Sequence, residues 1–146
     1  SIRVDETNYA HYRNLFSVIF TDFHLFDRLY GLENVDEETI YDLLDSMQLN
    51  GKTDFADGRF TNTNLSTGQR KRLAMITSCL EDKPIFVFDE VAADQDPIYR
   101  EYFYTTFLAE LKSKGKTVIA ATHDDRYFHI ADRLIKMECG KIVSIE

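Results

Sequence analysis

The feature that most constrains the fold of this sequence is the short apolar run Ile85-Phe86-Val87-Phe88, which two acids follow at once. A continuous apolar run of this length predicts a strand buried on both faces, as in a parallel sheet. The apolar runs 15–20 and 117–121 predict two more strands. Helix-like segments separate these runs, so we expect an α/β layer fold with its ligands at the carboxyl ends of the strands.

Three helices are expected between and after the strands, because apolar residues recur in these segments at helical spacing. Capping acids at Asp36 and Asp96 mark two of the starts. The expected spans are 36–50, 70–80 and 96–115. Residues 52–64 are rich in Thr, Asp, Asn and Gly and predict a loop. The runs 134–137 and 141–145 flank a Cys-Gly turn and predict a terminal hairpin.

Composition excludes several classes of protein. The 146 residues are 44% hydrophobic and 29% charged, which is enough apolar material for a core. No apolar run approaches the roughly 18 to 20 residues of a membrane span. A net charge of -8 argues against a general binder of nucleic-acid backbones, which needs a basic face. Cys79 and Cys139 are far apart and no Cys/His cluster accompanies them, so we expect reduced thiols and no structural zinc site.

Polar residues that can carry chemistry stand directly after each expected strand. They are Thr21 after the first, Asp89 and Glu90 after the second, and His123 after the third. A carboxylate at a strand end can hold Mg2+ or its water, while a neighbouring carboxylate orients an attacking water. The pattern indicates a magnesium–nucleotide site, although acids after a strand also occur in ordinary solvated loops.

The segment Ser66-Thr67-Gly68-Gln69 stands before the second expected helix and admits two interpretations. Ser66 and Gln69 have the spacing of a capping box, which satisfies free amides at a helix start. A serine hydroxyl, a glycine and a helix N-terminus also make a site for a terminal phosphate. Gly68 favours the second interpretation, because a cap alone does not need a glycine there.

Taken together, these motifs resemble the ATP-binding cassette (ABC) ATPases. Residues 65–69, Leu-Ser-Thr-Gly-Gln, resemble the family's signature motif, usually written LSGGQ. The run that ends in Asp89-Glu90 resembles Walker B with its catalytic glutamate, residues 93–96 resemble the D-loop, and His123 resembles the switch histidine. All four follow one another in the family's order. The resemblance implies part of a P-loop NTPase (RecA-like) core with the ABC helical subdomain.

The resemblance also implies a role for each matching residue. Asp89 would hold Mg2+ through water, Glu90 would act as general base toward the attacking water, and His123 would contact the γ-phosphate of ATP. Family members form head-to-tail dimers, so the signature residues would bind the nucleotide of the opposite protomer. These residues are Ser66, Thr67, Gly68 and Gln69. Asp96 would lie at the dimer interface, although by itself it is also a good helix cap.

The sequence departs from the family pattern at three places, and two of the segments concerned resemble one group within the family. Thr21 stands where the Q-loop has glutamine, Thr67 replaces a signature glycine, and Asp94-Gln95 replace the usual Ala-Leu of the D-loop. The segments 20–26 and 92–97 most resemble bacterial exporters of cyclic peptides, lipopeptides and siderophores, in which a membrane domain precedes the ATPase on the same chain. The implied location is the cytoplasmic face of the bacterial inner membrane, for a chain that is itself soluble and has no nucleic-acid partner.

A phosphate-binding loop is absent from these 146 residues. The motif G-x-x-x-x-G-K-[ST] supplies amides and a lysine that cradle phosphates, but Gly51-Lys52-Thr53 and Gly115-Lys116-Thr117 lack its earlier glycine. We therefore expect the C-terminal part of one nucleotide-binding domain, inactive as an ATPase by itself. Its expected parts are a core strand region at 1–20, the Q-loop region and helical subdomain at 21–83, and the RecA-like core at 84–146.

Two other functions fit some of the motifs. An ABC ATPase of DNA repair or chromosome maintenance also has a signature and a Walker B, but its C-terminal lobe follows a coiled coil, and no heptads precede the signature here. A degenerate regulatory cassette would explain Thr21 and Thr67. The intact Asp89, Glu90 and His123 favour the active ATPase of an exporter instead.

Overall fold

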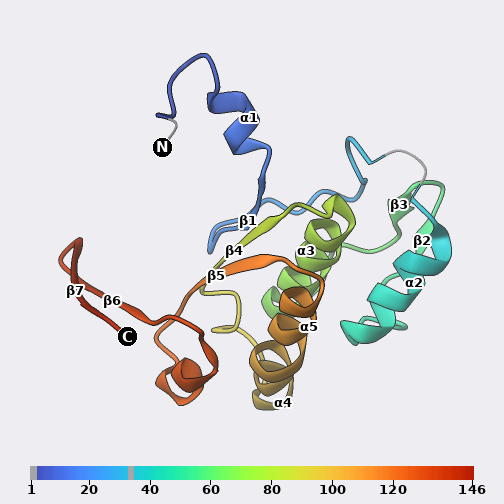
Figure 1. Ribbon diagram of the computed structural model, residues 1–146. Coiled ribbons are helices and arrows are strands. Elements are labelled where there is room, and N and C mark those ends of the chain that lie inside the picture. The colour runs from blue at the N-terminus through green and yellow to red at the C-terminus, as the bar shows by residue number, and fades with distance from the viewer. Residues whose placement is uncertain (1–2, 33–34) are drawn as a thin grey trace.

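A computed structural model describes residues 3–32 and 35–146 of the chain. Its centre is a three-stranded sheet in the order β1-β4-β5, formed by Phe16–Ile19, Ile85–Asp89 and Thr117–Ala121 (Figure 1). Both strand pairs are parallel, with Val18 opposite Val87 and Phe88 opposite Ala120. The strands coincide with the three predicted apolar runs. Their carboxyl ends therefore lie at the same end of the sheet.

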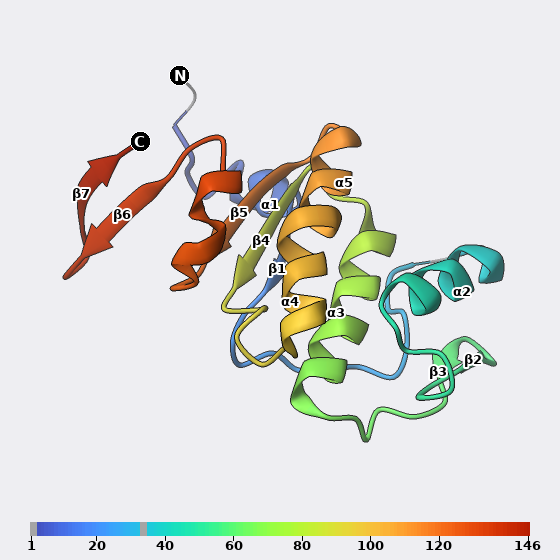
Figure 2. The same cartoon turned by 90° about the horizontal axis from the view of Figure 1, so that it is seen from below.

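Helices cover one face of this sheet. α3 (Thr67–Glu81) lies on that side together with a continuous helical segment made of α4 (Pro97–Tyr102), the π-helical turn η1 (Phe103–Phe107) and α5 (Leu108–Ser113) (Figure 2). Phe86 and Phe88 are buried. The ring centroid of Phe88 lies 5.5 Å from that of Phe103 and 6.0 Å from that of Phe107. An aromatic cluster thus forms the core between sheet and helices.

The prediction that residues 85–88 are buried on both faces is wrong for one face of the strand. Side chains alternate along a strand, and Ile85 and Val87 are only partly buried. Val18 and Ile119 flank Val87 in the register and are 38% and 51% exposed. Among the described residues, this second face of the sheet is apolar and partly open to solvent.

A smaller unit packs beside α3. It comprises α2 (Glu37–Ser46) and the hairpin of β2 (Phe55–Ala56) and β3 (Arg59–Phe60). Asp36 caps α2 as predicted, by accepting a hydrogen bond from the Thr39 amide. The prediction of a loop over 52–64 misses the hairpin. Its turn residues Asp57 and Gly58 both have positive φ, which a two-residue hairpin turn of type I′ requires, and Asp-Gly is the sequence signal for such a turn.

The predicted C-terminal hairpin is confirmed. β6 (Ile135–Glu138) and β7 (Lys141–Ile145) pair antiparallel with an irregularity at Lys136-Met137, and they extend away from the main sheet (Figure 1). Two short helices have no counterpart among the predictions. They are α1 (Tyr9–Arg13), before β1, and the 3-10 helix η2 (Asp125–Ile130), after β5.

The structure describes both cysteines, which the sequence predicted to be reduced thiols. Cys79 and Cys139 are both free thiols, and burial raises the pKa of Cys79 to about 12. Within residues 3–32 and 35–146, no helix is both long enough and apolar enough to cross a membrane.

Candidate active site at the carboxyl end of the sheet

The polar residues at the ends of the three strands come together. Thr21 follows β1, Asp89 is the last residue of β4, and His123 follows β5. The Thr21 hydroxyl donates to Oδ2 of Asp89, at 3.1 Å, and lies 3.3 Å from the Asp89 carbonyl oxygen. A hydroxyl and a carboxylate are therefore side by side at the end of the sheet, as parallel strands require.

Glu90 and His123 are in direct contact. Nε2 of His123 lies 2.8 Å from Oε1 of Glu90, and the side chains are 88% and 20% exposed. The Glu90 amide donates to the Ala121 carbonyl at 3.1 Å, so the pairing of β4 with β5 continues one residue beyond β4. A partly buried carboxylate beside an exposed imidazole can orient a water molecule and accept its proton. The sequence predicted both residues in one site but not their contact.

The signature-like segment begins α3. The Ser66 hydroxyl accepts a hydrogen bond from the Gln69 amide, at 3.3 Å, and the Gln69 side chain accepts one from the Ser66 amide, at 3.1 Å. Both halves of the predicted capping box are therefore present. Ser66 and Thr67 are exposed. The first turn of a 15-residue helix is thus open to a ligand, and the helix begins three residues earlier than the predicted span.

Gly68 has a packing role that the sequence did not reveal. A Cβ atom at this position would lie 2.7 Å from the backbone oxygen of Asp94 and 3.2 Å from Oε1 of Gln95. The Gly68 carbonyl accepts a hydrogen bond from Nε2 of Gln95 at 3.1 Å. The glycine therefore allows α3 to touch the segment that follows β4, and this reason for it is independent of phosphate binding.

Asp96 caps α4, as one of its two interpretations predicted. Its Oδ1 accepts from the Tyr99 amide at 2.9 Å, and its Oδ2 lies 2.6 Å from Nη2 of Arg72. The hydrogen bond from Tyr99 and then the Arg72 guanidinium lower the pKa of Asp96 below its ordinary value. Asp96 is half exposed, so its carboxylate also remains accessible from solvent.

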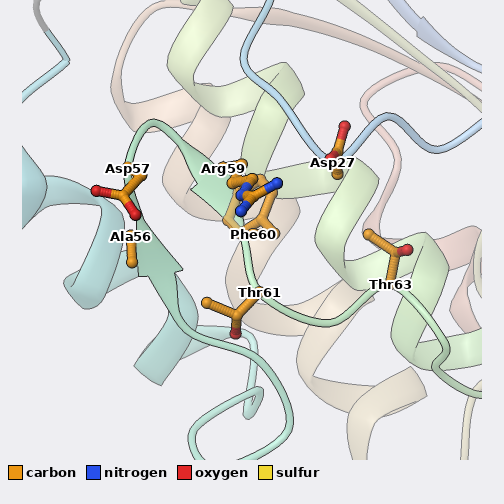
Figure 3. Close-up of a pocket in the computed structure, with 7 residues that line it drawn as sticks. All are labelled: Asp27, Ala56, Asp57, Arg59, Phe60, Thr61 and Thr63. Atoms are coloured by element: carbon orange, nitrogen blue, oxygen red, sulfur yellow. The ribbon is translucent and has the colours of Figure 1, made fainter.

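Of two hollows in the described residues, one is lined by predicted site residues. One of about 180 Å³ separates the Thr21 segment from the start of α3, and its lining includes Thr21, Thr67 and Arg70. The other, of about 350 Å³, lies at the β2–β3 hairpin (Figure 3). It is lined by Asp27, Ala56, Asp57, Arg59, Phe60, Thr61 and Thr63. Only the first hollow contains residues that the sequence predicted for the site.

Oxygen ligands suited to Mg2+ are present at the strand ends. Proteins bind Mg2+ through one or two carboxylates together with phosphate oxygens and water, and Asp89 with the Thr21 hydroxyl supplies such donors. In the described part of the chain, no group of three or more His, Cys, Asp or Glu side chains could hold a metal by itself. The Asp89 carboxylate and the Thr21 hydroxyl fit a magnesium ion whose other ligands are phosphate oxygens and water.

Sequence reasoning missed two buried cations on α3, Lys71 and Arg72. A signal for them exists in the helical spacing, because Gly68, Lys71, Arg72, Met75 and Ile76 follow the i, i+3, i+4, i+7, i+8 pattern of a buried helix face. Charged residues at core positions indicate buried partners. Arg72 is paired with the buried Gln95, whose Oε1 lies 2.8 Å from Nε of Arg72, and with the half-exposed carboxylate of Asp96.

Comparison with known proteins decides the family. The ABC transporter family matches residues 1–93, more than half of the chain. The chain belongs to the ABC transporter family. It is 46% identical to the ATP-binding protein SyrD of Pseudomonas syringae pv. syringae, over 97% of this chain and 26% of SyrD. It is 28% identical to the probable syringafactin export ATP-binding/permease protein SyfD of Pseudomonas syringae pv. syringae (strain B728a), over 90% of this chain and 21% of SyfD. The chain thus spans about a quarter of the length of these relatives.

Solved ABC structures share the fold. A dimeric, post-hydrolysis structure of the ATP-binding cassette MJ0796 with ADP and Pi matches with a TM-score of 0.72 and 24% identity, over 98% of this chain and 67% of that one. CbiO1 from Clostridium perfringens matches with a TM-score of 0.73 and 21% identity, over 97% of this chain and 60% of that one. These matches confirm the predicted partial P-loop NTPase fold of the α/β class. The roles of individual residues stay predictions.

Proposed function

We propose that this chain is part of the ATP-hydrolysing domain of an ABC exporter. The observation that carries the proposal is the 2.8 Å contact of Glu90 with His123, at the same end of the sheet as the hydrogen-bonded pair Asp89 and Thr21. A base, an imidazole and oxygen ligands for a metal are the groups that phosphoryl transfer to water needs. Membership of the ABC transporter family supports the same reaction.

Glu90 is the general base in this proposal. Its carboxylate orients the attacking water and takes its proton as the water oxygen bonds to the γ-phosphorus, a contribution on the order of 10^2 to 10^4 in rate. The bond from that phosphorus to the β–γ bridging oxygen breaks in the same reaction, so ADP leaves and phosphate is formed. His123 projects into solvent beside Glu90 and donates to the oxygens on which negative charge develops. Asp89 and Thr21 would hold Mg2+, which supplies positive charge to the phosphates when it is bound.

The start of α3 would serve a second copy of the domain. In a head-to-tail dimer, the signature residues Ser66, Thr67, Gly68 and Gln69 would face the γ-phosphate of the ATP held by the partner. The partial positive charge of the helix N-terminus and the exposed Ser66 and Thr67 support this. Asp96 would lie at the dimer interface. In this scheme residues 21–83 are the Q-loop region and helical subdomain, 84–146 belong to the RecA-like core, and 1–20 contribute its first strand region.

The proposed cargo is a peptide-like molecule or a siderophore. SyfD, which is 28% identical to this chain, is named for syringafactin export, and it combines an ATP-binding part with a permease. We propose the same arrangement here, with a membrane domain on the full-length chain and the ATPase on the cytoplasmic face of the bacterial inner membrane. ATP-driven closing and opening of the dimer would then power export.

ATP turnover by the full-length protein tests the proposal. We expect Glu90→Gln and His123→Ala each to lower kcat by about 10^2-fold or more, because each removes a group that acts in the transition state. Lys112→Met is the control, since Lys112 pairs with Asp132 at an exposed position on α5. Turnover that persists at the wild-type rate in Glu90→Gln would contradict the proposed base.

A further inference from the structure

We propose that Lys71 is a positioning residue that joins the signature segment of α3 to the backbone of Glu90. Lys71 is buried, with 1% of its side chain exposed, and its Nζ lies 2.8 Å from the Glu90 carbonyl oxygen and 2.6 Å from Oδ2 of Asp94. The inference deepens the ATPase function proposed above and rests on it. It assigns to Lys71 no contact with the nucleotide.

The buried ammonium group of Lys71 has two polar partners that compensate its charge. An unpaired buried charge is strongly unfavourable, whereas a charge with an ionic partner and a carbonyl acceptor is tolerated. Lys71 has both partners, and both belong to the segment that follows β4. The lysine is therefore held in one place and holds that segment in turn.

The backbone of Glu90 has an unusual conformation, and Lys71 contacts its carbonyl oxygen. Glu90 has φ of +52°, in the left-handed region that residues with a side chain rarely adopt. Its amide is fixed to the Ala121 carbonyl on β5, and its own carbonyl is fixed to Lys71 on α3. With both peptide groups held, the Glu90 side chain is directed to Nε2 of His123. A catalytic base needs this kind of fixation, because small displacements are costly in rate.

The same part of α3 carries the signature residues. Lys71 lies three residues after Gly68, whose carbonyl accepts from Gln95, and Arg72 donates to the other end of the Gln95 amide. In Figure 2 the loop between β4 and α4 passes beside the first turns of α3. A displacement of the signature segment would therefore reach Glu90 through Lys71. In the proposed dimer these two parts of one chain serve different ATP molecules, so Lys71 would link the two sites.

Lys71→Met in the full-length protein tests the inference. We expect kcat to fall about ten- to hundred-fold while the KM for ATP stays within about two-fold, because only the placement of the base is lost. Lys112→Met removes an exposed Lys–Asp pair and should leave kcat within about two-fold of wild type. In a Glu90→Gln background, Lys71→Met should lower the residual turnover no further, since the two residues act as a unit.

Other results of these experiments would overturn either the inference or the proposed function. An unchanged kcat in Lys71→Met, or an equal fold-loss with and without Glu90, would overturn the inference. If Lys71→Met does not fold, Lys71→Arg, which keeps the charge but moves its donors, must show the same fall in kcat at constant KM. If Glu90→Gln leaves the turnover of the full-length protein unchanged, the proposed function is overturned. If turnover depends on Glu90 but not on Lys71, the inference alone is overturned.

Discussion

Gly68 is the residue at which one added methyl group would have the clearest local effect. In Gly68→Ala the new Cβ would lie 2.7 Å from the Asp94 carbonyl oxygen, which is backbone and cannot rotate away. The gain in helix propensity is smaller than this clash, so we expect a loss of about 1–2 kcal/mol in the free energy of unfolding. Thermal unfolding measures it, with the exposed neighbour Thr67→Ala as the control. An unchanged melting temperature for Gly68→Ala would show that α3 does not pack against residue 94 in this way.

At this scale, the sequence identified the groups at the strand ends but not the groups that hold them. Thr21, Asp89, Glu90 and His123 could be found because each lies within two residues of the end of an apolar run. Lys71 could not be found in this way, because its partners are the backbone of Glu90 and the side chain of Asp94, both about twenty residues away in sequence. Contacts of this kind depend on how α3 meets the end of β4, which local patterns do not specify.

Single elements followed from the sequence where caps and periodicity agreed. Asp36 and Asp96 cap α2 and α4, and the capping box begins α3. The β2–β3 hairpin was missed because its strands have two residues each, too short for an alternating pattern. The π-helical turn η1 was missed because the apolar stripe of residues 96–115 also fits an ordinary α-helix.

Asp96 gives the start of α4 a dependence on pH. Its pKa in the folded protein is lower than the ordinary 3.8, so folding favours the charged form. Its contribution to stability is therefore full above about pH 4 and is lost as the pH falls through the lowered pKa. In Asp96→Asn the cap is retained but the charge facing Arg72 is not. We expect this variant to be less stable than wild type at pH 7, with a shallower loss of stability below pH 4.

Urea unfolding between pH 7 and pH 3 measures this difference. Asp124, whose pKa is also lowered, chiefly by its hydrogen bonds with Arg126, is present in both proteins and cancels in the comparison. Parallel curves for wild type and Asp96→Asn across the acid range would mean that Asp96 has no special interaction in the folded state.

For the molecule as a whole, the order of the motifs along the chain predicted the family and the fold class, which the composition did not. The ABC family and the α/β fold agree with that order. The sheet order β1-β4-β5 and the placing of the helices on one face were not predicted. The open apolar face at Val18 and Ile119 did not follow from the sequence, because a continuous apolar run predicts burial on both faces without specifying what covers each face.

The most direct test of the account is the oligomeric state of the full-length Glu90→Gln protein with MgATP, measured by light scattering together with the amount of ATP retained. With the base removed and the binding groups intact, ATP should remain unhydrolysed and hold two nucleotide-binding domains together. We predict a stable dimer that retains ATP, whereas wild type should dimerise only transiently. A Glu90→Gln protein that hydrolyses ATP at the wild-type rate and accumulates no ATP-bound dimer would contradict the account.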